Sequence, residues 1–336
     1  MGAKLELQVV DEYKYLGLWY HHSLKWHVHA REVMKKAQRS SALILRIIQR
    51  NAPPTVRTIR ALILSFLLPA ITYGCPFWKP CPTEFNSILA LTCTPLLRVL
   101  HLSSSTHRLS LLAECGVPPI RTLWEKLTLS FAVRLARLPP DHPCSVLFAA
   151  QSPTNRHHAF RSSLAASKKK WKCSALSLTR RSLRRAAAVE QTRAWRADGK
   201  CRDLVALRPT TQHGIAPYLR RDSYDVCALR ARLRLNRSAL HSSLFRRRAR
   251  PDSVCPCCGA KDETVAHLLV CPHYATQRAR LPTFLISRAR RAPRAPFTLA
   301  HLLGEVHTLR RSDRASALAA GGRFLVAVRD TRPNGL

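Results

Sequence analysis

Apolar side chains in the first part of the chain recur at the spacing of an α-helix. Between Trp26 and Ile48 they return every three or four residues, which keeps them on one side of a helix. The opposite side carries four basic residues, namely Lys35, Arg39, Arg46 and Arg50. Such a charged face is typical of an ordinary solvated surface helix, and the functional alternative is a basic ridge that follows a phosphate backbone.

Period-two alternation precedes this helix, and further helices follow it. Tyr13, Tyr15 and Trp19 lie on one face of an extended segment at 13–20, and core positions are their simplest interpretation because aromatic side chains bury large apolar areas. After Pro53-Pro54, the pattern predicts helices at 56–68, 84–100, 121–138 and 222–233. The chain is therefore predicted to be mainly α, with a short N-terminal strand or hairpin.

The composition adds a large excess of positive charge to this picture. The 336 residues include 56 Lys and Arg against 19 Asp and Glu, a formal net charge of +37, and 46% of the residues are hydrophobic. The hydrophobic share supports folded cores and excludes a wholly disordered basic tail. So much like charge favours a polyanionic partner, so we expect binding to the backbone of RNA or DNA and no small-molecule substrate.

The positive charge is concentrated in the middle of the chain. Residues 151–250 carry 25 Lys and Arg against 5 Asp and Glu, a net of +20. Together with Pro-rich and polar borders, this predicts a helical region at 1–150, a basic helical connector at 151–250, a small metal module at 251–280 and a basic, partly helical tail at 281–336. The candidate phosphate-binding residues of the connector are Lys168, Lys169, Lys170, Arg230, Arg234, Arg237, Arg246, Arg247 and Arg248.

Three of these arginines share one predicted helix face. Arg230, Arg234 and Arg237 follow one another at steps of four and three, a spacing that suits contacts along a phosphate backbone. A charged, solvated linker is the plain alternative for the basic runs, which are also typical of nuclear import signals.

The N-terminal residues and the longest uncharged run predict neither export nor a membrane span. Glu6, Asp11 and Glu12 interrupt the first residues, where a secretory signal would be apolar. The uncharged run at 61–78 is 18 residues long but contains Pro69, which predicts a buried helix followed by a loop. We expect an intracellular protein, nuclear in preference to cytoplasmic, without a membrane partner.

Cysteine and histidine in the last third of the chain follow the spacing of a metal site. The pattern Cys-x2-Cys-x8-His-x3-Cys is formed by Cys255, Cys258, His267 and Cys271. A tight turn lets the first two thiolates bind one ion, and a helix starting at Asp262 or Thr264 would present the last two ligands one turn apart. Three thiolates and one imidazole complete a tetrahedral shell, so we expect one structural zinc ion, Zn(2+). Cys257 and His273 are competing ligand candidates.

Several short motifs resemble the end of a non-LTR (LINE-type) retrotransposon reverse transcriptase. They are YKYLG at 13–17, SLKWHVH at 23–29, LPAITYG at 68–74 followed by Trp78, GVPP at 116–119 and LARLPP at 135–140. The Cys3His pattern and the Arg-rich helix before it resemble the C-terminal zinc element of the same proteins. The resemblance implies a thumb-like helical bundle whose first strand leaves the catalytic palm, with Lys14 within reach of a nucleic-acid backbone.

Reverse transcription in that family depends on palm carboxylates that hold two divalent ions. In the family they precede the motif found here at 13–17, and the residues before Tyr13 contain no aromatic-x-Asp-Asp sequence. We therefore expect a nucleic-acid-binding C-terminal part of such a protein that is not an enzyme as this chain stands. A palm-containing reverse transcriptase chain is then an expected partner.

Two alternatives to this function stay open from the sequence. In one, the chain is a component of an RNA-directed DNA polymerase whose palm is supplied by another chain or is missing from the gene model. In the other, it is a decayed element product without a selected role.

Overall fold

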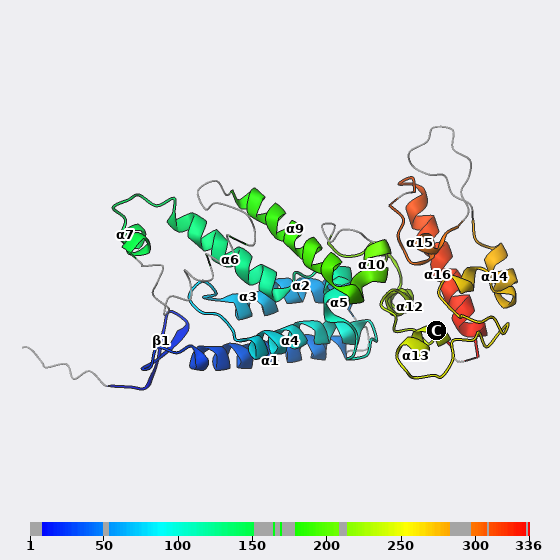
Figure 1. The fold of residues 1–336 in the computed structure, drawn as a ribbon, viewed down its shortest axis with the longest axis horizontal. Helices are drawn as coiled ribbons and strands as arrows, with labels where there is room; N and C mark the ends of the chain where they lie inside the picture. Colours follow the sequence, from blue (N-terminus) through cyan, green and yellow to red (C-terminus); the bar gives the residue numbers. More distant parts are fainter. Residues whose placement is uncertain are drawn as a thin grey trace, which may run out of the picture. The chain divides into compact units, whose positions relative to one another are not determined.

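The computed structural model describes residues 9–49, 54–150, 164, 169, 179–207, 214–282, 297–307, 309–333 and 335–336 (Figure 1). Over these residues the protein is mainly helical with one N-terminal hairpin, as predicted. The longer helices are α1 (His27–Ile48), α4 (Pro82–Val99), α6 (Ile120–Leu135), α9 (Arg180–Ala197), α12 (Tyr224–Arg234) and α16 (Asp313–Thr331). The shorter α-helices are α2 (Val56–Leu62), α3 (Leu68–Thr72), α5 (Arg108–Cys115), α7 (Pro143–Ala150), α10 (Arg202–Leu207), α11 (Tyr218–Arg221), α13 (His241–Arg246), α14 (Ala275–Ala279) and α15 (Leu299–Leu302).

The chain forms two compact units, each assembled from three separate stretches. Unit 1 consists of Met1–Ile44, Leu62–Thr92 and Pro118–Gln191, and unit 2 of Leu45–Ala61, Cys93–Val117 and Thr192–Leu336. Unit 2 therefore draws on the predicted helical region at 1–150 as well as on the three segments that follow it.

The hairpin at the start of unit 1 exposes its tyrosines. β1 (Glu12–Tyr15) pairs antiparallel with β2 (Leu18–His21), and the two-residue turn between them has positive φ at both Leu16 and Gly17. The reversal places Tyr13 opposite Tyr20, whereas Trp19 lies opposite Lys14 on the other face. Tyr13 and Tyr15 are 61% and 56% exposed. The expectation of a buried face shared with Trp19 is therefore wrong, because a hairpin of two strands has no second layer to cover β1.

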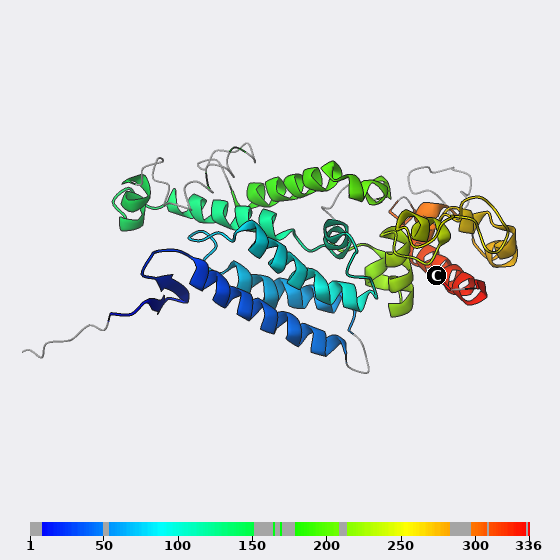
Figure 2. The same cartoon turned by 60° about the horizontal axis from the view of Figure 1, so that its bottom comes forward.

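Helix α1 confirms the amphipathic pattern of the sequence. Val33, Ala37 and Ile44 are buried, while Lys35, Arg39 and Arg46 on the opposite side are exposed. The Ser41 hydroxyl donates a hydrogen bond to the Leu91 carbonyl on α4 over 3.1 Å, and the two helices run side by side in both ribbon views (Figure 2). The apolar face of α1 thus packs on α4 and leaves the basic face to solvent.

Aromatic side chains from separate segments build the core of unit 1. The buried Trp78 ring lies 4.7 Å from the His29 ring and 4.9 Å from the Trp124 ring, both edge to face. Phe85 extends the cluster, with its ring 5.7 Å from that of Trp124. Burial lowers the pKa of His29 to about 4, so its ring is neutral near pH 7 and packs as a core side chain.

The predicted helix at 56–68 continues past Pro69. Between α2 and α3 the chain forms one turn of π-helix, Ile63–Leu67, and Pro69 lies at the start of α3. A proline lacks the N–H of a helix interior but fits a first turn, so the π-helical turn lets the chain stay helical through this position. Among the helices described, none is both long and apolar enough to cross a membrane.

Part of the predicted connector folds against α6. Leu183 of α9 joins a buried cluster with Leu129 and Val133 of α6, and the two helices lie side by side in both ribbon views. Leu164 belongs to the same cluster. The described part of 151–191 is therefore packed structure, which the charge of the sequence alone did not reveal.

One apolar core in unit 2 joins the metal module to the last long helix. Leu229 and Leu233 of α12, Cys271 of the metal motif, and Phe324 and Leu325 of α16 belong to one cluster of buried residues. The predicted boundary at residue 280 therefore does not separate two cores. The described part of the segment predicted as a basic, partly helical tail at 281–336 includes the helix α16, whose apolar face is buried in this core.

Buried ion pairs correct the assignment of Arg230 and Arg234 to phosphate binding. Arg230 is 0% exposed, pairs with Asp222, and donates to the Leu302 and Leu318 carbonyls over 2.8 Å each. Arg234 is 3% exposed. The two arginines share a helix face as predicted, but that face points into the core.

Arg234 lies between two carboxylates. Its guanidinium donates to Glu114 over 2.7 and 2.9 Å and to Glu305 over 2.8 Å, and Tyr218 donates to Glu114 over 2.9 Å. Burial opposes the charge on Arg234, but Glu114 outweighs that effect, so the pKa of Arg234 is raised. This cluster connects α5, α12 and the segment after α15 within unit 2.

Replacing Arg234 should destabilise unit 2 strongly. Arg234→Met leaves Glu114 and Glu305 buried without their cation, and we expect a loss of about 3 to 5 kcal/mol of unfolding free energy. The exposed Arg221 is a matched control, and Arg221→Met should change stability by no more than about 0.5 kcal/mol. Urea denaturation followed by circular dichroism measures both, and equal effects of the two substitutions would contradict the structure.

Candidate metal centre

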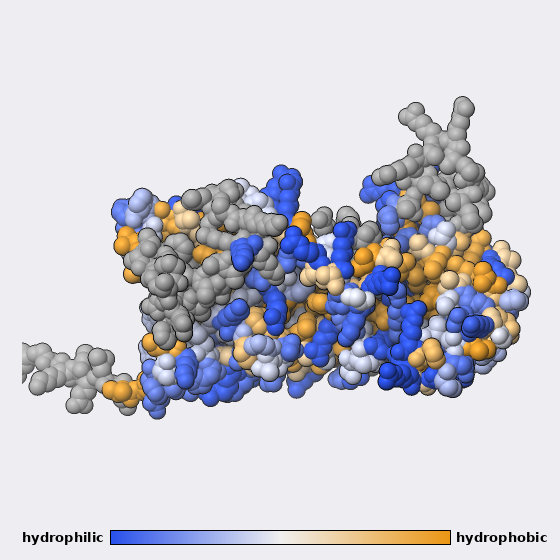
Figure 3. Space-filling model, in the orientation of Figure 1, coloured by the Kyte–Doolittle hydropathy of each residue, from blue (hydrophilic) through white to orange (hydrophobic). Residues whose placement is uncertain are grey.

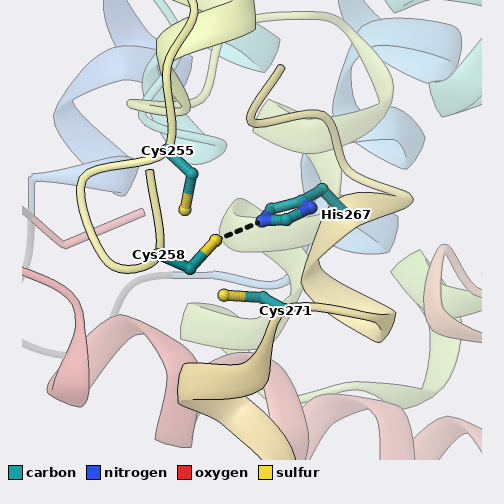
Figure 4. A group of neighbouring side chains, drawn as sticks. All are labelled: Cys255, Cys258, His267 and Cys271. Atoms are coloured by element: carbon teal, nitrogen blue, oxygen red, sulfur yellow. Dashed lines mark hydrogen bonds between the residues drawn. The ribbon is translucent and has the colours of Figure 1, made fainter. Parts of the chain in front are cut away.

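The four residues of the Cys-x2-Cys-x8-His-x3-Cys pattern converge in space (Figure 4). One ligand atom from each of them lies within 4.8 Å of the other three. The Cys258 sulfur lies 3.2 Å from His267 Nε2. Cys255 and Cys271 are buried at 1% and 0% exposure, while Cys258 is exposed. This group could hold a metal ion such as zinc.

A tight loop presents the first two cysteines. The Cys255 N–H donates to the Ala260 carbonyl over 2.8 Å, and the Gly259 N–H donates to the Cys255 carbonyl over 2.9 Å. Gly259 has a φ of +72°, in the left-handed region that glycine adopts without a Cβ clash. The glycine after Cys258 therefore lets the chain turn back and bring both sulfurs to the same side, as Figure 4 shows.

A short turn presents the other two ligands, in place of the helix expected from Asp262 or Thr264. His267–Leu269 form a single turn of 3-10 helix, and Pro272 follows directly after Cys271. The Thr264 hydroxyl accepts a hydrogen bond from the His267 N–H over 3.2 Å, and the Cys271 N–H donates to the His267 carbonyl over 2.8 Å. This last bond runs from residue i+4 back to residue i, as in an α-helix. His267 and Cys271 therefore lie one turn apart, as the expected helix would have placed them.

The two competing ligands lie outside the cluster. The Cys257 sulfur is 3.4 Å from the Tyr274 hydroxyl, which turns it away from the other sulfurs. His273 is exposed, and its ring packs edge to face against the Tyr274 ring with centroids 5.1 Å apart. The geometry therefore favours Cys255 and Cys258 as the first pair.

The protonation chemistry of the cluster suits a cation. Burial raises the pKa of the Cys255 thiol to about 12 and also raises the pKa of Cys271, so both would be neutral thiols on their own near pH 7. The backbone N–H of Ala260 lowers the pKa of Cys258. A divalent ion at the centre of the group would supply the positive charge that converts these thiols to thiolates.

Glu263 anchors the segment between the two pairs of ligands. Its side chain is 0% exposed and accepts two hydrogen bonds of 2.8 Å from Arg332, the residue directly after α16. It also accepts from the His241 N–H over 2.7 Å, and the Ser242 hydroxyl donates to the Glu263 carbonyl over 2.6 Å. The metal loop is thus held from α13 and from the end of α16.

The structure divides the predicted nucleic-acid contacts into exposed and internal residues. Arg237 is partly buried and donates to the Ser105 carbonyl, and Arg247 donates to the Ser243 and Ser238 carbonyls over 3.1 and 2.9 Å. Both are therefore bound within the fold. Lys168, Lys170 and Arg50 lie outside the described residues. The candidates that are exposed are Lys35, Arg39, Arg46, Lys169, Arg246 and Arg248.

No protein-family model, curated protein or solved structure matches this chain. The sequence and the geometry of the residues are therefore the basis for any functional proposal.

Sequence reasoning missed the residues that support the metal loop. Glu263 and Arg332 are 69 positions apart, so no local spacing connects them. Phe245 and Arg250, which flank the arginine run at 246–248, were also not singled out. An exposed aromatic residue next to clustered arginines is the signal that could have found them, since this combination suits nucleic-acid bases and phosphates.

The ligand assignment predicts selective loss of metal. Cys258→Ser and His267→Ala should each lower the bound metal by one ion per chain, because each removes one member of a tetrahedral set. Cys257→Ser should leave the metal content unchanged, since its sulfur faces Tyr274. Elemental analysis of the purified variants measures the metal content. Metal loss in Cys257→Ser alone would show that Cys257, and not Cys258, is a ligand from the first loop.

Proposed function

We propose that this chain binds the phosphate backbone of RNA or DNA. The observation that supports the proposal best is a basic groove in unit 2, close in sequence to the Cys3His cluster. The groove has a volume of about 650 Å³, and its lining residues are Phe245, Arg246, Arg248, Ala249, Arg250 and Pro251. Three guanidinium groups beside an aromatic ring match the requirements of a strand that offers phosphates and bases.

The groove residues are available for a ligand. Phe245 is 49% exposed, and the Arg246 side chain is 56% exposed. Its contacts are at the surface, an ion pair of 3.2 Å to Asp203 and a hydrogen bond of 3.4 Å to the Asn236 side-chain oxygen. The Nε of Arg250 has no hydrogen-bond partner among the described residues. Buried polar atoms normally have a partner, so a phosphate oxygen is a suitable acceptor for this donor.

The groove depends on a change of direction after α13. Arg248 has a φ of +57°, and Arg247 is fixed by its two bonds to backbone carbonyls. One arginine of the run thus anchors the backbone, while its two neighbours line the groove. Arg247 therefore has a structural role, whereas Arg246 and Arg248 are the arginines of the run that are placed to contact a phosphate.

We propose that one zinc ion at the Cys3His group has a structural role in unit 2. Three thiolates and one imidazole leave no position for a reactive water in a tetrahedral shell. Cys255 and Cys271 also belong to the core shared with α12 and α16, so the ion would stabilise a substantial part of unit 2.

Further basic surface is present on two long helices. Lys35, Arg39 and Arg46 are exposed on α1, and hydrophilic residues cover the lower edge of Figure 3, where that helix runs. On α9 the exposed arginines are Arg181, Arg184, Arg185, Arg193 and Arg196. Rows of charge along a helix favour backbone contacts with little dependence on base sequence.

We also propose that the chain corresponds to the C-terminal part of a non-LTR retrotransposon reverse transcriptase, acting in the nucleus beside a palm-containing chain. The order of features supports this: a hairpin at the YKYLG motif, a helical region, and a Cys3His group after an arginine-rich helix. Tyr73 of the LPAITYG motif donates to the Leu16 carbonyl over 2.6 Å, so two of the resembling motifs meet in unit 1.

Removing the groove arginines should weaken nucleic-acid binding and its salt dependence. Arg246→Ala with Arg248→Ala removes up to two phosphate contacts, so the slope of log K against log salt should become shallower by roughly 1.4 to 1.8. Fluorescence anisotropy with single-stranded RNA and DNA over a range of salt concentrations measures this slope.

The matched control removes the same charge from another exposed place. Arg310 and Arg311 are exposed residues of unit 2 outside the groove, and Arg310→Ala with Arg311→Ala should leave most of the slope unchanged. Equal losses from the two double variants would show that only net charge matters and would exclude the groove as the binding site.

Primer extension tests the catalytic part of the proposal. The sequence contains no Asp-Asp pair, and a two-metal polymerase needs closely placed carboxylates, so the purified chain should not extend a primer on an RNA template. Template-dependent synthesis that persists after contaminating polymerases are removed would contradict this expectation. Synthesis only after a palm-containing chain is added would favour a polymerase component.

A further inference from the structure

The aromatic side chain in the basic groove has no ring partner in the fold. Phe245 lies in the last turn of α13 and is 49% exposed. Among the described residues, its ring contacts neither a second aromatic ring nor a cation. A single exposed aromatic residue is ordinary on a protein surface, so the surroundings of Phe245 decide what its ring can do.

The helix that carries Phe245 is fixed at its other end. Leu240, directly before α13, is 0% exposed and belongs to the core of unit 2. The first turn of α13 is bonded to Glu263, through the His241 N–H and the Ser242 hydroxyl. Phe245 is therefore presented on a rigid element, which reduces the entropy that is lost when a ligand packs against its ring.

The end of α13 places an arginine where the backbone favours glycine. The Ala249 N–H donates to the Leu244 carbonyl and the Arg248 N–H donates to the Phe245 carbonyl, both over 2.9 Å. These two bonds form the Schellman helix end, in which the left-handed residue is usually glycine. Here that residue is Arg248, with a φ of +57°. Strained positions of this kind are characteristic of ligand sites, and the Arg248 side chain lines the groove.

We propose that the basic groove takes an unpaired segment of RNA or DNA, with one base stacked on Phe245 and neighbouring phosphates on Arg246 and Arg248. This inference rests on the nucleic-acid binding proposed for the groove, and it adds the class of ligand, which is single-stranded in preference to duplex. The groove volume of about 650 Å³ lies within the range of about 300 to 1,000 Å³ that is typical of pockets for small organic ligands, and one nucleotide is a ligand of that kind.

The ring of Phe245 is the group that distinguishes a single strand from a duplex. Arginines bind the phosphates of either form, so the charge of the groove does not select between them. In a duplex each base is covered on both faces by its neighbours, and a side chain stacks on a base only where the strand is unpaired. Phenylalanine also has no hydrogen-bonding group with which to read base edges in a groove of the duplex.

Binding of matched oligonucleotides by the full chain tests the inference. The probes are a labelled single-stranded DNA, a single-stranded RNA of the same sequence and the corresponding DNA duplex, followed by fluorescence anisotropy. Phe245→Ala should weaken binding of both single strands by roughly 5- to 100-fold, the effect of one stacked base, and should leave duplex binding within about twofold. The salt dependence should not change, because no charge is removed.

An exposed aromatic residue outside the groove is the matched control. Phe66 is 48% exposed and belongs to unit 1, and Phe66→Ala should leave the affinity for all three probes unchanged. Phe245→Trp keeps an aromatic ring and should retain the preference for single strands.

Arg248→Gly separates loss of binding from loss of folding. Glycine suits the left-handed position, so this variant should unfold at the same urea concentration as the parent or at a higher one. Its affinity for the single strands should nevertheless fall, and the slope of log K against log salt should become shallower by roughly 0.7. Unchanged affinity in Arg248→Gly would overturn the assignment of a phosphate to this residue.

Two outcomes would overturn the preference for single strands. One is unchanged single-strand affinity in Phe245→Ala, and the other is an equal loss for single strands and duplex, which would indicate insertion of the ring between base pairs. Either result leaves the proposed backbone binding in place. A parent protein that binds none of the three probes would overturn the proposed function as well.

Discussion

The ion pair between Glu263 and Arg332 is the interaction on which the metal loop depends. Both side chains are 0% exposed, and two hydrogen bonds of 2.8 Å join them. Glu263 lies between the two pairs of metal ligands in the sequence, so fixing it sets where the Cys255 turn and the His267 turn meet. A buried carboxylate without its cation is costly, and the end of α16 must therefore be in place for the loop to reach its observed conformation.

The cost of burying a charge without a partner also explains why some basic residues between 230 and 248 are internal and others lie at the surface. A buried guanidinium needs carboxylates or carbonyls for its donors, and Arg230 and Arg234 find them in Asp222, Glu114 and Glu305. Arg246 and Arg248 have no such enclosure and remain at the surface. Sequence spacing places residues on a common helix face, but only the partners across the core decide whether that face meets protein or solvent.

Features set by neighbouring residues could be predicted from the sequence, and those set by distant residues could not. The amphipathic α1 and the Cys3His group were predictable because a helical repeat and a ligand spacing are local. The burial of Arg234 was not, since Glu114 is 120 positions away, and neither was the approach of Cys201 to His107 over 94 positions. The tyrosine-bearing segment was predicted as a strand or hairpin, but whether a second layer covers it cannot be deduced from alternation.

The distribution of acidic residues strengthens the argument for a polyanionic partner. Among the described residues, Glu114, Glu190, Glu263 and Glu305 are buried, and so is the side chain of Asp222, whereas the buried cations are Arg230, Arg234 and Arg332. More acidic than basic groups are thus taken out of contact with solvent, although the whole chain has a net charge of +37. Acidic residues that could have neutralised the exterior are used inside the fold. The exposed arginines are left in excess at the surface, where phosphate is the complementary charge.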